Sequence, residues 1–333
     1  MATVPTYSQT LSTFVSSTLD EHQKGVIDQI WSTTDMLAYF SSRRKPQAGG
    51  KSIFVPLEYG KNTSITKGLG RGSKMDMVMD EIITEAQYFW QTYGGSVIRF
   101  RDDELENSGK YQVFNIVQAY INNMIKSFQE VLEQDLLADN DGTNGFAGLK
   151  FLIEDATNNA TDSSVTAGSN TVGGINRASA GNEWWSNWGR NMTGKEPSIY
   201  LTYYMREAVN NIRTFTGRDP EVMLTHYVVR DLYEDEVQET LRTSTVQMGD
   251  IGIRAVEWKG IPFITSPYMD TTRIYFIGQD ALEMYYEPRM WFKSTPWKEP
   301  TQQPFDFARQ TLAKGQLTIK KPRATHVLYN INA

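Results

Sequence analysis

The chain has 333 residues, of which 40% are hydrophobic and 12% aromatic, enough for about two domains of ~150 residues with their own cores. The absence of cysteine excludes disulfide frameworks, thiolate metal sites and cysteine nucleophiles, and the net charge of −6 argues against a general nucleic-acid binder. No signal peptide is evident, and no stretch approaches the ~18 apolar residues of a membrane span, so we expect a soluble chain without membrane contact.

The first segments predict an N-terminal arm and a long hairpin. Asp20 can cap a helix, and Arg43–Pro46 would end it. Ser52–Leu57 is typical of a strand, the glycine-rich run Gly60–Gly72 follows, and Ile82–Tyr93 is typical of a second strand. We therefore expect a hairpin with a flexible tip. The sequence shows no obvious core to cover this hairpin, so we expect it to be mobile in the isolated chain.

Charge divides this half of the chain into two blocks. Residues 41–74 carry eight Lys or Arg against Glu58, a net charge of +7, whereas residues 75–141 carry thirteen acids against four bases, a net charge of −9. Such runs are usually solvated faces, but opposite blocks on one chain also suit contact between its copies. The candidate contact residues at the hairpin tip are Lys61, Lys67, Arg71 and Lys74.

The clearest helix is predicted at Tyr111–Leu137. Its apolar residues recur at helical spacing and form one stripe, which consists of Val113, Val117, Tyr120, Met124, Phe128, Val131 and Leu132. At ~1.5 Å per residue this helix would be about 40 Å long. Residues 139–145, rich in Asp, Asn and Gly, would end it. We expect the stripe to pack on a sheet of the same chain.

Beyond this helix, a long loop and an α/β module are predicted. Residues 149–188 are rich in Asn, Thr, Ser and Gly, and they end in a Trp cluster that more often fills a core edge than binds a ligand. Pro197 can begin a helix that Gly217 ends, and a second helix passes through Leu232 and Leu241. Strands are expected at Val222–Thr225, Ile253–Trp258, Pro262–Thr265, Arg273–Ile277, Gln316–Ile319 and Thr325–Tyr329.

Three motifs resemble ligand sites without completing them. Gly189–Glu196 fits the phosphate-binding G-x-x-x-x-G-K, but Glu196 replaces the Ser or Thr that would hold magnesium, and its charge would repel phosphates. Gly68–Lys74 lacks the spacing of a dinucleotide loop, and Asp139–Lys150 lacks the Gly and Glu of a calcium loop. We therefore expect no cofactor and no metal.

The titratable residues give no catalytic pattern either. His22, His226 and His326 are separated by about a hundred residues or more, match no local metal-ligand spacing and are expected to be structural. The acids between Asp102 and Glu106 could pair as in a glycosidase, but acids directly before a helix more often stabilise its N-terminal end. We predict no catalytic residue and retain a carbohydrate-active enzyme as a weaker alternative.

The order of the elements, together with five short motifs, resembles the HK97-type major capsid protein of tailed bacteriophages. The motifs are residues 86–98 before the long helix, 148–152 after it, 172–177 before the Trp cluster, 258–263 and 321–325. The resemblance covers nearly the whole chain. It implies an α+β HK97-like capsid fold with an N-terminal arm (1–45), an E-loop hairpin (46–95), a P-domain with a long spine helix (96–147), an α/β A-domain (148–286) and closing P-domain strands (287–333).

The resemblance also implies a function. Proteins of this type are not enzymes, and they self-assemble into an icosahedral shell of hexamers and pentamers that encloses double-stranded DNA. The expected partners are further copies of the chain, a separate scaffolding protein, a portal and DNA that is contacted without sequence specificity, and the expected location is a virion assembled in the bacterial cytoplasm. The family's E-loop overlaps the adjacent subunit. An encapsulin-like compartment, which shares the fold but encloses protein cargo, is the main alternative.

Overall fold

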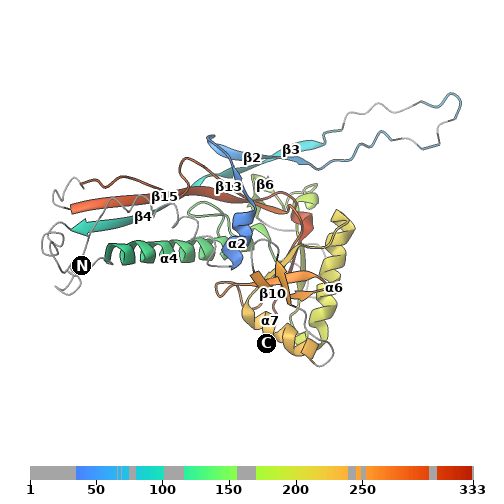
Figure 1. Cartoon of the computed structure of the whole chain (residues 1–333). Coiled ribbons are helices and arrows are strands. Elements are labelled where there is room, and N and C mark those ends of the chain that lie inside the picture. The colour runs from blue at the N-terminus through green and yellow to red at the C-terminus, as the bar shows by residue number, and fades with distance from the viewer. Residues whose placement is uncertain are drawn as a thin grey trace.

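The computed structural model describes residues 35–65, 67–68, 70–74, 80–100, 116–155, 170–238, 245–248, 253–299 and 306–331. A five-stranded sheet with a long helix beside it and a seven-stranded sheet with two helices form the body. A two-stranded ribbon projects from this body (Figure 1). The mixed helix and strand content agrees with the expected α+β class.

The predicted arm enters the body through a short helix and strand. α2 (Asp35–Ser42) buries its apolar residues, among them Leu37 and Phe40, in the main core. Arg43–Pro46 ends the helix as predicted, and β1 (Arg44–Pro46) pairs in parallel with β13 (Leu282–Tyr286). The predicted start of the helix at Asp20 lies outside the residues that the structure describes.

The predicted strand Ile82–Tyr93 is in fact two strands that belong to different sheets. β3 (Ile83–Phe89) pairs with β2 (Ser52–Glu58) to form the ribbon, whereas β4 (Gln91–Phe100) belongs to the five-stranded sheet. Trp90 separates them. The prediction of one strand was wrong because the apolar pattern of the ribbon continues into that of the sheet.

β15 (Asp306–Ile319) organises the five-stranded sheet. Its first ten residues pair with β4 from Asp306↔Phe100 to Gly315↔Gln91, and its end pairs with β13. β14 (Lys293–Ser294) pairs with Leu312 and Thr311 of β15, on the edge opposite to β4. The sequence predicted only Gln316–Ile319 of this strand, because the preceding residues mix charged and apolar side chains.

The long helix α4 (Ile116–Leu137) packs on this sheet, as expected. Phe128 and Leu132 of the predicted stripe are buried, whereas Val131 is half exposed. The helix ends at Leu137 as predicted, and its predicted first residues, 111–115, lie outside the described part. Gly95 of β4 lies against Phe128, since a Cβ at this position would lie within 2.3 Å of the ring.

The α/β module is a seven-stranded sheet with two helices on one face. The strand order is β7 (Trp188–Asn191), β16 (Thr325–Tyr329), β12 (Ile274–Ile277), β8 (Val222–Thr225), β11 (Ile261–Thr265), β10 (Ile253–Trp258) and β9 (Thr245–Met248). α6 (Pro197–Thr216) begins at Pro197 and ends at Gly217, whose φ of 71° a glycine adopts without strain, and α7 (Tyr227–Gln238) lies beside α6. The prediction of this module is confirmed for the described residues, and Leu241, through which the second helix was expected to pass, lies outside them.

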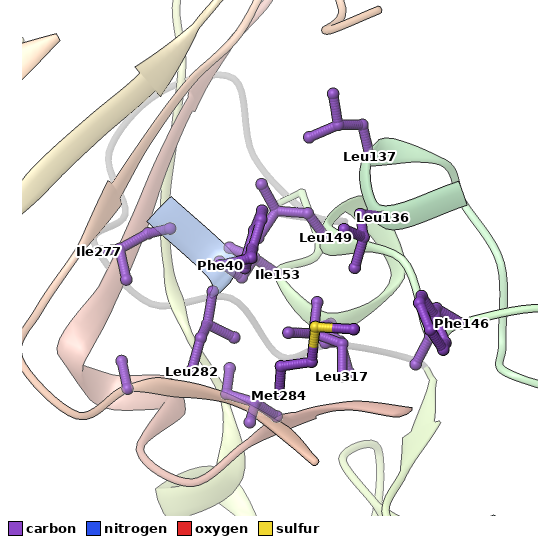
Figure 2. Close-up of a cluster of buried hydrophobic side chains, with 14 of the residues drawn as sticks. Phe40, Leu136, Leu137, Phe146, Leu149, Ile153, Ile277, Leu282, Met284 and Leu317 are labelled. Carbon is purple, nitrogen blue, oxygen red and sulfur yellow. The ribbon is translucent and has the colours of Figure 1, made fainter. Parts of the chain in front are cut away.

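Alternating side chains of the seven-stranded sheet pack into two separate cores, one on each face. On β8, Val222 and Leu224 join the main core, while Met223 joins a second core under α6 and α7. The main core also receives α2, α4 and the five-stranded sheet, so it links the two sheets. Figure 2 shows these side chains converging, with Phe40, Leu136 and Leu317 contributed by three separate elements.

The predicted loop 149–188 contains more structure than expected. α5 (Leu149–Leu152), the hairpin β5 (Thr171–Val172) and β6 (Ile175–Asn176), and the turn η2 (Glu183–Trp185) lie within it, and residues 156–169 are not described. Trp185 is fully buried, so the expectation that the Trp cluster fills a core edge is confirmed for this residue. The local sequence, which is mostly small and polar, gave no signal for the hairpin.

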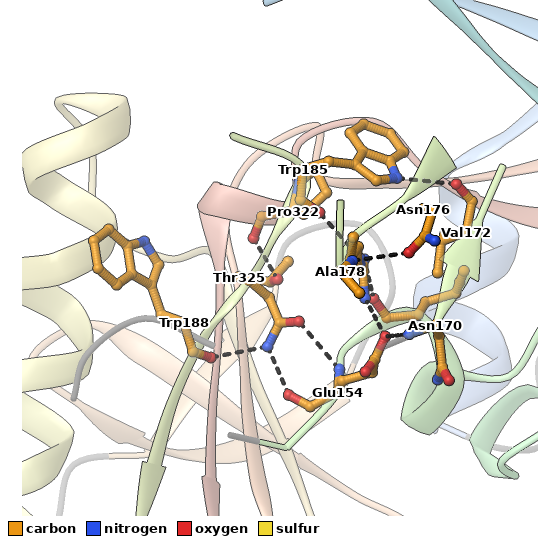
Figure 3. A network of polar contacts seen from close by, with 12 residues as sticks. Glu154, Asn170, Val172, Asn176, Ala178, Trp185, Trp188, Pro322 and Thr325 are labelled. Carbon is orange, nitrogen blue, oxygen red and sulfur yellow. Dashed lines mark hydrogen bonds and ion pairs between the residues drawn. The ribbon is translucent and has the colours of Figure 1, made fainter. Parts of the chain in front are cut away.

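A buried ion pair between Arg177 and Glu154 belongs to a polar network in this segment. Figure 3 shows the network around Glu154. The guanidinium of Arg177, which is almost fully buried, donates to Glu154 at 3.1 Å and to the carbonyl oxygens of Leu152 and Trp185 at 2.8 and 3.0 Å. Glu154 Oε1 also accepts the backbone N–H of Asn170 at 3.1 Å. The charge-assisted bonds satisfy the buried guanidinium, which would otherwise be strongly destabilising.

Replacement of Gly95 by Ala tests the packing of α4 on the sheet. The new methyl group would overlap the ring of Phe128, and overpacking of this kind costs about 1–3 kcal/mol. We expect chemical denaturation to show this loss and the double variant G95A/F128L to recover part of it. Gly94→Ala is the control, since its Cβ would meet only the end of the Leu312 side chain at 3.3 Å. Equal stability of G95A and G94A would contradict the packing.

His326 of β16 gives a prediction for acid stability. It is fully buried against Phe276, neither ring nitrogen makes a well-formed hydrogen bond within the described part of the chain, and burial lowers the pKa of its imidazole to about 3. Below pH 6.5 the unfolded state therefore binds a proton that the folded state does not. The free energy of unfolding should fall by about 1.4 kcal/mol for each pH unit from 6.5 toward 3 from this group alone.

His326→Phe should remove this contribution. Urea denaturation between pH 8 and pH 4 should give wild type a steeper acid loss than H326F, while the two curves run parallel above pH 7. The difference between the curves isolates this histidine from the carboxylates, which titrate in both proteins. Parallel curves across the whole range would show that the folded protein admits a proton at His326.

Candidate intersubunit interface

The root of the ribbon is part of the main core. One face, made by alternate residues of both strands, is buried, and it consists of Ile53, Val55, Leu57, Ala86 and Tyr88. The hydroxyl of Tyr88 also donates to the carbonyl of Ile319 at 2.9 Å. The expectation that the hairpin has no core to cover it was therefore wrong for its root, because residues far away in the sequence supply that core.

The opposite face of the ribbon carries exposed apolar side chains, between which Glu58, Glu85 and Gln87 also lie. Phe54, Ile83 and Phe89 are 53%, 67% and 56% exposed, and they alternate along the two strands with the buried residues. A projecting two-stranded ribbon cannot cover this face itself. Exposed apolar patches of this kind mark interaction sites in soluble proteins.

The four candidate residues Lys61, Lys67, Arg71 and Lys74 lie on the exposed, projecting part of the ribbon. None of them forms an ion pair within the described part of the chain. The nearby acid Asp80 already has partners, because the backbone N–H and the hydroxyl of Thr63 donate to it at 2.6 and 2.9 Å. These bonds hold the pKa of Asp80 below its usual range. The tip therefore presents positive charge that its own acid does not neutralise.

Two other bases of the +7 block, Arg43 and Lys45, lie at the root and have acidic partners. Arg43 pairs with Glu221, and Lys45 Nζ lies 2.6 Å from Glu283. Glu283 is nearly buried and also contacts Lys320, and these lysines hold its pKa below the usual range against the effect of burial. Part of the basic block is thus neutralised at the root, whereas the four bases of the tip have no ion pair within the described residues.

The acidic block is divided in the same way. Glu81 and Glu85 lie on the ribbon itself, whereas Glu133 is buried and receives a hydrogen bond from Ser266 at 2.5 Å. Burial raises the pKa of Glu133. The exposed acids on the described part of the body are fewer than the net charge of −9 suggests. Within residues 116–141 the exposed acids are Glu130, Asp139 and Asp141.

The incomplete motifs form ordinary turns. Gly189 lies in β7, and the side chain of Asn191 accepts the backbone N–H of Thr193 at 2.9 Å, so this segment closes on itself. In the acidic loop, the side chain of Asp141 likewise accepts the N–H of Thr143 at 2.8 Å. Asp102–Glu106 and His22 lie outside the described residues.

Two further features are absent from the described residues. No group of three or more His, Asp or Glu side chains there is arranged to hold a metal ion. No helix in the same ranges is long and apolar enough to cross a membrane.

Comparison with known proteins gives similarity in structure but not in sequence. No protein-family model and no curated protein matches the chain. The holo-SrpI encapsulin complex from Synechococcus elongatus PCC 7942 is similar to 100% of this chain and 97% of its own, with 13% identity and a TM-score of 0.56. The capsid asymmetric unit of cyanophage A-1(L) matches 90% of this chain and 93% of its own, with 16% identity and a TM-score of 0.61.

A third solved structure, the capsid of a native GTA particle, covers 99% of this chain and 96% of its own, with 11% identity and a TM-score of 0.53. All three are shell proteins by their descriptions, and each comparison extends over nearly the entire length of both chains. Identities this low establish the fold and not the function. The chain has the α+β HK97-like capsid fold that its order of elements predicted.

Proposed function

We propose that this chain is a major capsid protein of a tailed bacteriophage, which self-assembles into an icosahedral shell of hexamers and pentamers around double-stranded DNA. The observation that carries the proposal is the projecting ribbon, because it leaves an apolar face and an unpaired basic tip exposed on a fold that known shell proteins share. The role is structural and non-enzymatic. The protein would be part of the virion, after assembly in the bacterial cytoplasm.

The division of the chain follows from the same proposal. We assign residues 1–45 to an N-terminal arm, 46–95 to the E-loop, 96–147 and 287–333 to the P-domain with α4 as its spine helix, and 148–286 to the A-domain. A separate scaffolding protein and a portal would be partners during assembly of the procapsid. DNA would be contacted locally and without readout of its sequence, through basic residues such as those of the C-terminal strands.

The ribbon would bind a neighbouring copy by two physical effects of different size. Burial of a Phe or Ile side chain contributes about 1.5–3 kcal/mol, whereas an exposed ion pair contributes about 0.2–1 kcal/mol. The apolar face would therefore supply most of the affinity. The basic tip would select the register against acids such as Glu130, Asp139 and Asp141, and its contribution would weaken with salt.

The encapsulin alternative is favoured by one observation, the match of the SrpI encapsulin complex over the full length of this chain. The contents of purified shells separate the two functions. A capsid protein expressed with its packaging partners should yield particles whose ultraviolet absorbance spectrum is dominated by nucleic acid. Shells that instead enclose a defined protein and no DNA would favour the encapsulin function.

Reversal of the tip charges tests the ribbon as an assembly contact. The variant K61E/K67E/R71E/K74E should unfold at the same denaturant concentration as wild type, because these side chains are exposed. It should nevertheless form fewer or misassembled shells, which electron microscopy and sedimentation can measure. Wild-type assembly should also decline from 50 mM to 500 mM salt without being abolished, since the apolar contact remains.

The quadruple Lys/Arg→Gln variant is the matched control. It removes the attraction without adding repulsion, so its assembly should lie between that of wild type and that of the charge reversal. Shells of normal size and yield from the charge-reversed protein would contradict the proposed role of the tip.

A further inference from the structure

The small β5–β6 hairpin contacts the ribbon at its root. The carbonyl oxygen of Gly173, in the hairpin turn, accepts the backbone N–H of Gln87 on β3 at 2.9 Å. The contact is close, because a Cβ on Gly173 would lie 2.8 Å from Cβ of Ala86 and 3.1 Å from the ring and hydroxyl of Tyr88. Only a glycine leaves room for the ribbon at this distance.

A second contact lies where the ribbon leaves the body. The ring of Tyr59, which follows β2, stacks on Trp184 with ring centroids 5.0 Å apart and an interplanar angle of 23°. The two contacts hold both strands of the ribbon, since Tyr59 continues β2 and Gln87 belongs to β3. Together with the bond from Tyr88 to Ile319, they oppose rotation of the ribbon about its root.

The residues that make these contacts are themselves rigidly supported. Trp185 is fully buried, and its indole N–H donates to the carbonyl of Val172 at 3.0 Å, which ties η2 to the hairpin. Its carbonyl accepts from Arg177, which is fixed in turn by Glu154. The hairpin and Trp184 therefore rest on the buried ion pair described above.

The length of the ribbon amplifies any change at its root. At about 3.3 Å per residue the chain from Tyr59 to Gly70 can reach about 35 Å, so a rotation of about 10° at the root moves the tip by about 6 Å. This displacement is larger than the distance between neighbouring strands of a sheet. A contact made by the outer ribbon therefore depends on how firmly the root is held.

We propose that the β5–β6 hairpin and Trp184, here named the clasp, are positioning elements that set the direction of the ribbon and thereby the curvature and diameter of the shell. The inference rests on the proposed function. In a closed assembly each copy repeats the same contact with the next, so the angle of one contact fixes the size at which the assembly closes. The clasp sets this angle in the isolated chain, before any neighbour binds.

Two neighbouring glycines provide a matched test. Gly173 and Gly174 have φ values of 60° and 78°, so Ala places a side chain in the left-handed region at both positions. A Cβ at Gly174 meets nothing within 4 Å, whereas one at Gly173 meets the ribbon. We expect cryo-electron microscopy to show shells of altered or mixed diameter for Gly173→Ala and of wild-type diameter for Gly174→Ala.

Trp184 supplies a second pair of variants in case G173A does not fold. Trp184→Ala removes the stacking on Tyr59 and should also change the diameter of the shell. Trp184→Phe retains a ring that can stack on Tyr59, and its shells should have the wild-type diameter. Loss of stability alone would lower the yield of shells without changing their size. Wild-type diameters from folded G173A and W184A would overturn the inference.

A measurement on the unassembled chain separates the clasp from the proposed function. Because the sequence contains no cysteine, Gly70→Cys on the tip and Asn210→Cys on α6 can carry two spin labels without background. The distance distribution should be equally narrow with wild-type glycines and with G174A, and it should shift or broaden with G173A. An unchanged distribution in G173A would overturn the clasp, whereas failure of the wild-type chain to form shells under all conditions would overturn the capsid function instead.

Discussion

The pairing of β15 with strands from both halves of the chain is the interaction on which the structure depends. Over fourteen residues it hydrogen-bonds to β4, β13 and β14, and β13 in turn receives β1. Through these strands it joins residues near the start of the described chain to its end. Its backbone ladder builds the five-stranded sheet, and its buried Leu317 and Ile319 belong to the core that α4, the ribbon and the α/β module share.

The side chains of β15 extend this frame to the ribbon and to the segment after α4. Gln316, which is nearly buried, accepts the backbone N–H of Ala147 at 2.8 Å and donates to the carbonyl of Phe89 at 2.9 Å. One amide thus binds backbone groups of two segments, and the N–H of Ala147 is buried there. The residues that connect the ribbon to the body are consequently fixed by backbone polarity as well as by apolar packing.

Local periodicity predicted the elements whose burial depends on their own sequence. The stripe of α4 and the alternation of β2 follow from one buried face, and Pro197 and Gly217 bound α6 because each suits a helix end. The order of these elements was sufficient to indicate the fold. The exposed outer face of the ribbon was not predicted, because alternation alone does not show which of the two faces a distant core covers.

The features missed by sequence reasoning depend on long-range partners. The first half of β15 is a strand because β4 pairs with it. The buried Arg177 is tolerated because Glu154, at the start of the predicted loop 149–188, forms an ion pair with it. The count of charges along the sequence also omits such partners. It grouped bases by sequence, whereas in space Arg43 and Lys45 are neutralised by acids that lie more than a hundred residues away.

The bond between Glu154 and the backbone of Asn170 has a consequence for the evolution of this chain. It holds Glu154 and Asn170 side by side, and Arg177 fixes the carboxylate of Glu154 from the other side. The entropic cost of lengthening a closed loop grows only with the logarithm of its length, about 0.6 kcal/mol for each doubling. A change in the number of residues between Glu154 and Asn170 therefore alters the closure entropy little and leaves the contacts of Arg177 and Glu154 in place.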